Sequence, residues 1–311
     1  MSTRRSNPLG TTSRRGQKSS DMKTFLKNNY KIMAIVALMI AGLSLLVYPL
    51  VANTWNNHVQ ATLVNNYTES VDTAIEEGKL DVSAELEKAE EYNAELLPSI
   101  LPDSFAEAEA NGTDSEYMSL LNANDDGVMG YIQIPSINVK LPIFHTTDDD
   151  VLQIGVGHLE GSSLPVGGPN THSVLSAHRG LPSATLFTDL DKVELGDDFF
   201  VIIMGEYFAY EVDQIEVVEP DDTSLLQVED GKDLCTLITC TPYGVNTQRL
   251  MVRGHRVEYT PTLLAEADTP LFGAVSLHTN YLLWVIVGLA IVAAFSLMLF
   301  FLDRKKNQKV Q

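Results

Sequence analysis

A cysteine and an arginine in the stretch TLITCTPYGVNTQRLMVRGHR have the spacing of a catalytic pair. Cys240 ends the apolar run TLITC, and Arg249 begins the next such run, RLMVRG, nine residues later. If the two runs form a hairpin joined by TPYGVNTQ, residues 240 and 249 lie nearly opposite each other at its mouth. A guanidinium there favours a thiolate and offers fixed donors to a developing oxyanion. The pair predicts a cysteine nucleophile, the alternatives being a small buried cysteine and a surface arginine.

A cysteine nucleophile also needs a group that accepts and donates a proton, and histidine suits this role near neutral pH. The chain has seven histidines: His58, His145, His158, His172, His178, His255 and His278. We favour His178, because it ends the apolar run SVLSAH and precedes the loop RGLP, so that it lies at a strand end as Cys240 does. His172 precedes the same strand and is expected at the other end of the fold. The histidine spacings do not resemble a zinc-ligand pattern, so we predict neither a catalytic metal nor another cofactor.

The two cysteines, Cys235 and Cys240, lie in the segment LCTLITC, which has the character of one strand. Their odd separation places them on opposite faces, about 16 Å apart along the strand. Bridged cysteines have Cα atoms within about 7 Å of each other. We therefore predict no disulfide between them, and we interpret Cys235 as a small buried apolar residue.

The elements that would position these residues are short β-rich segments between Gly, Pro and Asp turns. These segments are VMGYIQIP, INVKLPIF, HSVLSAH, DFFVIIM, YFAYEVDQIEVVE, CTLITC and QRLMVRGHRVEY. Their number and spacing predict a closed β-barrel or a sandwich over residues 128–262. The region before it, 53–127, is predicted to be helical as far as about residue 97, with an N-cap at Asp81 or Ser83. Residues 98–127 contain prolines and glycines that predict a loop with at most one short helix.

Two long apolar runs, predicted as transmembrane helices at 32–52 and 281–302, flank this region. Each is long enough to cross a hydrocarbon core of about 30 Å. The alternatives are a buried core helix for either run and a cleaved signal peptide for the first. The first run's length, its late start and its lack of a clean A-x-A site favour an uncleaved anchor.

Charge predicts the orientation of the two spans. The short flanks 1–31 and 303–311 are basic and are therefore expected in the cytoplasm. The segment between the spans, including a juxtamembrane linker at 263–280, is then extracellular. It carries 39 of the 41 acidic residues and nine of the 21 basic residues, a formal charge near −30. This charge argues against binding nucleic acid or anionic lipid and suits a lysine-bearing protein partner.

Two blocks of the sequence resemble the sortase family. TLITCTPYGVNTQRLMVRGHR resembles the sortase signature TCTP-Y-G-x-N-T-x-R-L, and HSVLSAHRGLPSATLFTDLD resembles the segment that carries the sortase histidine. With two spans and the blocks GVMGYIQIPSINVKLPIFH and VLQIGVGHLEGSSLPVGG, the chain looks like a class C, pilus-assembling sortase over about residues 60–260. The resemblance implies an eight-stranded β-barrel on the outer face of a Gram-positive cell, joining pilin subunits by transpeptidation.

The resemblance also implies roles for individual residues. Cys240 would be the nucleophile, His178 the general acid and base, and Arg249 the oxyanion stabiliser. The thiolate would attack the Thr–Gly carbonyl of a Leu-Pro-x-Thr-Gly-like sorting signal. A pilin lysine would then resolve the thioacyl intermediate.

Class C enzymes usually have a lid with an Asp-Pro-aromatic motif, and the matching residues here are Asp103, Ser104 and Phe105. The resemblance implies that Asp103 lies near Arg249 or Cys240 and that Phe105 fills the substrate groove. Serine lacks the fixed φ of proline, which predicts a looser lid. A second departure is Gln248, where a histidine is expected; its side chain should point away from Cys240.

Two other functions remain open. A cell-wall anchoring sortase or a hydrolase would use the same three residues, but the second span and the lid segment disfavour both. An inactive membrane-bound assembly scaffold could keep the barrel alone. The presence of Cys240, His178 and Arg249 together disfavours that scaffold.

Overall fold

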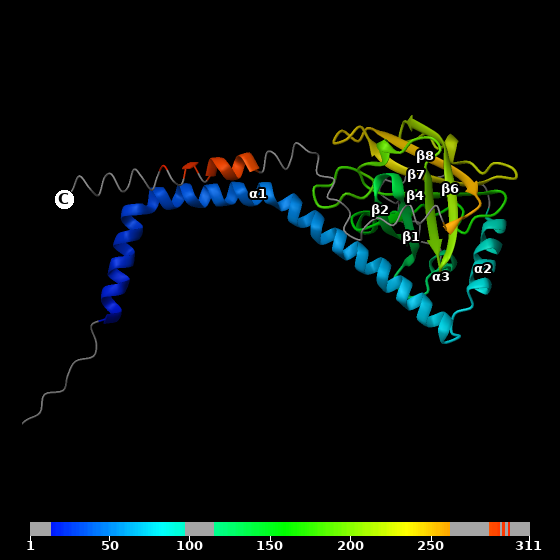
Figure 1. Ribbon diagram of the computed structural model, residues 1–311, viewed down its shortest axis with the longest axis horizontal. Coiled ribbons are helices and arrows are strands. Elements are labelled where there is room, and N and C mark those ends of the chain that lie inside the picture. The colour runs from blue at the N-terminus through cyan, green and yellow to red at the C-terminus, as the bar shows by residue number, and fades with distance from the viewer. Residues whose placement is uncertain (1–13, 97–114, 262–285, 293, 296–297, 299–311) are drawn as a thin grey trace, which may run out of the picture. The chain divides into compact units, whose positions relative to one another are not determined.

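The computed structural model describes residues 14–96, 115–261, 286–292, 294–295 and 298 (Figure 1). The chain divides into two compact units, one made of Met1–Tyr48 with Leu277–Gln311 and the other of Pro49–Ser276. The second unit contains the β-rich region and all three predicted catalytic residues.

The second unit is built on a closed barrel of eight strands in the order β1-β2-β3-β4-β7-β8-β6-β5. The strands are β1 (Val128–Ile134), β2 (Val139–His145), β3 (Val156–His158), β4 (Thr171–Ser176), β5 (Asp198–Ile203), β6 (Glu206–Val218), β7 (Asp233–Thr241) and β8 (Gln248–Val257). The pairs β2–β3 and β4–β7 are parallel, and the other pairs are antiparallel. The predicted closed barrel is therefore confirmed. The sequence patterns missed β3, because three residues are too few to show a period.

Several strands of the barrel are buried on both faces. Every residue of β1 and β4 is buried. Burial on both faces explains why β1, VMGYIQI, is nearly continuously apolar and does not alternate. Inside the barrel, the rings of Phe199 and Tyr210 stack with centroids 5.4 Å apart. Gly254 on β8 leaves room for them, since a Cβ there would lie 2.6 Å from the Phe199 ring.

Two helices are joined to the barrel unit by side-chain hydrogen bonds, which are buried for the first helix and partly buried for the second. In α1 (Arg14–Glu76), the Tyr67 hydroxyl donates to the carbonyl of Met129 at 2.8 Å and accepts from the Met204 amide at 2.8 Å. In α2 (Val82–Glu95), the side-chain amide of Asn93 makes two bonds with the backbone of Leu164, at 3.1 and 2.7 Å. These bonds fix the helices that precede the barrel in sequence.

The start of α2 distinguishes between the two predicted caps. The Asp81 side chain accepts a hydrogen bond from the Ala84 amide at 3.2 Å, so Asp81 is the N-cap and Ser83 lies within the helix. The short helices α3 (Ser115–Ser119) and α4 (Asp149–Leu152) follow later in the chain. The predicted lid residues Asp103, Ser104 and Phe105 lie outside the described residues.

Among the described residues, one helical segment, Met33–Glu76, is long and apolar enough to cross a membrane, with a mean hydropathy of 2.4 in its most apolar window. It includes most of the span predicted at 32–52. The helix itself begins at Arg14, so the predicted boundary at residue 32 does not coincide with a helix end. The linker predicted at 263–280 and most of the span predicted at 281–302 lie outside the described residues.

Candidate active site

The hairpin of β7 and β8 places Cys240 directly opposite Arg249, as the spacing predicted. Both residues are buried, with Cys240 7% exposed and Arg249 8% exposed. The Arg249 guanidinium donates from Nη1 to the carbonyl of Gln248 at 3.2 Å and to that of Asn246 at 3.4 Å. These bonds hold the cation at the mouth of the hairpin, where it can stabilise a negative charge that develops beside the thiol.

The parallel pairing of β4 with β7 brings His178 to the same end of the barrel. Thr171 pairs with Asp233, and the register continues without a shift to Ser176 opposite Ile238. Beyond the strand, the Ala177 amide donates to the Ile238 carbonyl at 3.2 Å, and the buried Thr239 hydroxyl donates to the Ala177 carbonyl at 2.7 Å. One more step in this register would bring His178 level with Cys240. The strands β4, β7 and β8 are neighbours in the barrel (Figure 1). Cys240 and Arg249 lie on β7 and β8, and His178 follows the end of β4 by two residues.

The residue after His178 is also part of this region, although the sequence patterns did not single it out. Arg179 is buried, and its guanidinium donates to the carbonyl of Thr188 at 3.1 Å and to the hydroxyl of Thr241 at 3.0 Å. It also pairs with the Asp191 carboxylate. The sequence signal for Arg179 was its position directly after the candidate histidine. Arginines in loops are most often exposed, so this position alone did not indicate a buried residue.

Comparison with known proteins places this arrangement in a family. The profile of the sortase domain matches residues 132–257. The crystal structure of sortase C-1 from Actinomyces oris is 47% identical, with a TM-score of 0.55, and the match covers 57% of this chain and 98% of that one. The chain belongs to the sortase family. This membership confirms the predicted enzyme class, a sortase-type cysteine transpeptidase.

Two further relatives show how far the similarity of this sortase extends. Sortase C1 from Streptococcus agalactiae is 46% identical with a TM-score of 0.56, and the match covers 64% of this chain and all of that one. Sortase D of Bacillus subtilis is 36% identical over 131 residues, which are 41% of this chain and 63% of that protein. The similarity to sortase C structures agrees with the class predicted from the sequence blocks.

The electrostatic surroundings of His178 favour its neutral form. Partial burial lowers the pKa of the His178 imidazole below its usual value, and the nearby Asp149 carboxylate raises it in part. In this sortase, Asp149 is the first residue of α4 and is exposed. A carboxylate so placed favours the protonated imidazolium and counteracts part of the effect of burial.

We therefore expect that Asp149→Asn lowers the pKa of His178 further, because the substitution removes the carboxylate and keeps the side-chain shape. An NMR pH titration of the His178 imidazole measures this shift directly. Asp150→Asn, one residue further along the same exposed turn, is the matched control and should leave the titration close to wild type. An unchanged or raised midpoint in Asp149→Asn would contradict the assignment.

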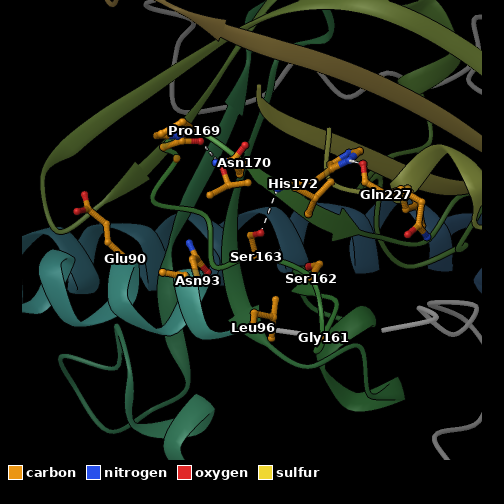
Figure 2. A pocket seen from close by; sticks show the side chains of 16 residues that line it. Glu90, Asn93, Leu96, Gly161, Ser162, Ser163, Pro169, Asn170, His172 and Gln227 are labelled. Carbon is orange, nitrogen blue, oxygen red and sulfur yellow. Dashed lines mark hydrogen bonds between the residues drawn. The ribbon is translucent and has the colours of Figure 1, made fainter. Parts of the chain in front are cut away.

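The structure separates His172 from the site, as predicted. His172 lies at the start of β4 and lines a cavity of about 570 Å³ beside α2 (Figure 2). Its Nδ1–H donates to the Gln227 carbonyl at 2.9 Å, and its Nε2 accepts from the Thr236 hydroxyl at 2.7 Å. Burial lowers the pKa of this imidazole. With both nitrogens bonded and the ring neutral, His172 has a structural role.

The structure also shows the surroundings of the two cysteines and of Gln248. Neither cysteine forms a disulfide, and Cys235 is completely buried, which raises the pKa of its thiol. The Gln248 amide donates to the Glu219 carboxylate at 2.9 Å on the exposed surface. The Gln248 side chain therefore points away from Cys240, as expected from its place in the strand.

Proposed function

We propose that this sortase polymerises pilins: it cleaves a Leu-Pro-x-Thr-Gly-like signal between Thr and Gly and joins the acyl group to a pilin lysine. The proposal is supported by the pairing of Cys240 with Arg249 and by the parallel β4–β7 register, which leads the chain toward His178 at the same end of the barrel. The similarity to sortase C enzymes supports pilin as the substrate class. Among them, the Streptococcus pneumoniae sortase C structure, 41% identical, is described in terms of its pilin substrate specificity.

The three side chains divide the reaction among them. The Cys240 thiolate attacks the Thr carbonyl carbon, and the Arg249 guanidinium donates hydrogen bonds to the oxyanion that forms. The His178 imidazolium gives its proton to the glycine nitrogen as the C–N bond breaks, which leaves a thioester on Cys240. A lysine amine then attacks this thioester, loses a proton to the imidazole and releases the thiolate. The product is an isopeptide bond, and the enzyme is regenerated.

We also propose that the catalytic unit lies outside the membrane of a Gram-positive cell, with both termini in the cytoplasm. The apolar helix segment starting at Met33 supports an N-terminal anchor. The apolar composition of 281–302 and the basic flanks 1–31 and 303–311 support a second span and this orientation. The excess negative charge of the intervening segment suits a lysine-bearing partner.

The experiment that tests this function combines the full chain in detergent micelles with a Leu-Pro-x-Thr-Gly peptide and analyses the enzyme by intact-mass spectrometry. We expect an acyl adduct that ends in threonine and that transfers to a pilin fragment through its lysine. Transfer to a peptidoglycan amine in place of the pilin lysine would favour the cell-wall anchoring alternative. Release to water alone would favour the hydrolase, and no adduct would return the scaffold to consideration.

The lid proposed at Asp103, Ser104 and Phe105 makes a separate prediction. Deleting residues 100–106 should raise the rate at which a small alkylating reagent labels Cys240 several-fold, because a side chain resting on the thiol limits access to it. The labelling rate is followed by mass spectrometry, and Ser104→Pro should lower it if proline restores a fixed backbone. Equal rates in the intact and deleted chains would contradict a lid.

A further inference from the structure

The side chain of Arg179 connects the chain segment that carries His178 with the one that carries Cys240. Thr188 and Asp191 follow His178 along the same connection, whereas Thr241 comes directly after Cys240. The loop around His178 is closed by two further bonds, from the Phe187 amide to the His178 carbonyl and from the Gly180 amide to the Thr188 hydroxyl, both at 3.2 Å. The Arg179 guanidinium thus rests on an ordered loop and reaches across to the end of β7.

This bridge lies where the backbone ladder between the two strands ends. The bonds between β4 and β7 reach Ala177, and the Arg179–Thr241 bond extends the connection by two residues. After Thr241 the chain continues into residues 242–247, all of them exposed. On its other side the end of β7 is held by β8, where Cys240 pairs with Arg249 and Thr241 with Gln248. Toward β4, the Arg179–Thr241 bond is the contact that ties this strand end to the segment of His178.

Burying the Arg179 guanidinium costs free energy, because the charged group loses its hydration. The Arg179 side chain is 7% exposed, whereas that of Asp191, its carboxylate partner within the described part of the chain, is 46% exposed. Desolvating a cation commonly costs more than such a pair returns, so stability alone does not account for it. A planar guanidinium can, however, hold three acceptors in fixed directions, and here the acceptors belong to two separate segments.

We propose that Arg179 is a positioning residue for acyl transfer, which sets the separation of the Cys240 thiol and the His178 imidazole by holding the Thr241 hydroxyl. Arg179 would act through its contacts with Thr188, Asp191 and Thr241. Attack by the Cys240 thiolate and proton donation from the His178 imidazolium act on neighbouring atoms of one peptide bond, so both groups must be placed within about 0.5 Å of the productive geometry. The acylation assay of this inference rests on the proposed function, because it uses the proposed peptide substrate. The contacts of Arg179 do not depend on which substrate is bound.

The test uses the full chain in micelles with four single substitutions. Thr241→Val removes the hydroxyl that accepts from Arg179 and keeps the side-chain shape, whereas Thr241→Ser keeps that hydroxyl. Arg179→Lys keeps the positive charge but lacks the planar guanidinium. Arg253→Lys is the matched control, since Arg253 is also a largely buried arginine that makes several bonds, to Asp213 and Glu229. Each variant is assayed for single-turnover acylation, for the pH profile of Cys240 alkylation and for thermal unfolding.

We expect Thr241→Val and Arg179→Lys each to lower the acylation rate constant about 10- to 100-fold, with KM little changed, and to displace the alkylation pH profile. The double variant should be no worse than the poorer single one, because both break the same bond. Thr241→Ser should recover most of the rate, and Arg253→Lys should leave the profile in place.

Additive effects of the two substitutions, or lowered unfolding temperatures with an unmoved alkylation profile, would overturn the positioning role. If the wild-type thiol is alkylated but forms no adduct with the peptide, the proposed substrate is wrong. The comparison of alkylation profiles still decides the role of Arg179 in that case.

Discussion

Replacement of Cys240 by alanine should abolish the acyl adduct, whereas replacement of Cys235 by alanine should leave adduct formation intact. Cys240 lies at a strand end beside the Arg249 guanidinium, whereas Cys235 pairs with Gly254 in the middle of the barrel wall. Burial raises the pKa of the Cys235 thiol and keeps it protonated, so it has neither access to a substrate nor the charge of a nucleophile. Intact-mass spectrometry after mixing with the peptide distinguishes the two thiols.

Cys235→Ala is the matched control in this comparison, because it removes the same atoms from the same strand. It should lower the stability of the barrel by about 1 kcal/mol, as removing a small buried group commonly does. An adduct that persists in Cys240→Ala, or one that disappears in Cys235→Ala while the protein remains folded, would contradict the assignment of the nucleophile.

Replacement of Arg249 by glutamine should lower the rate constant of acylation by about 10²- to 10³-fold, with a small effect on KM. Arg249 is buried opposite Cys240, and its guanidinium is anchored at the hairpin mouth by the carbonyls of Gln248 and Asn246. Charge on the substrate oxygen develops only in the transition state, so the loss of the donor affects the rate of the chemical step more than substrate binding. Single-turnover acylation measured over a range of peptide concentrations separates the two.

Arg253→Gln provides the control for this prediction. Arg253 lies four residues further along β8, on the same face as Arg249, and pairs with Asp213 and Glu229. Its replacement should change stability and leave the acylation rate constant close to wild type. Equal losses from the two substitutions would indicate a general effect of charge on the barrel and would argue against oxyanion stabilisation by Arg249. A large rise in KM alone would instead make Arg249 a substrate-binding residue.

The features that the sequence determined by itself are local ones. The β-rich segments follow from their apolar and β-branched residues and from the turns between them. The pairing of Cys240 with Arg249 follows from two apolar runs joined by a short connection, since neighbouring strands of this kind form a hairpin whose register the connection sets. The strand-end position of His178 and the distant position of His172 follow from the same reasoning along one strand.

Only the tertiary structure decided which strand ends meet. The parallel pairing of β4 with β7 leads the chain toward His178 at the end of the barrel where Cys240 lies, and this register depends on contacts between segments far apart in the chain. The strand β3 forms because its neighbours pair with it, and its own three residues carry no periodic signal. The reach of Arg179 to Thr241 likewise appears only once both strand ends are placed. Local patterns specify elements and hairpins, but non-local register is a sum over many weak contacts that no single stretch of sequence contains.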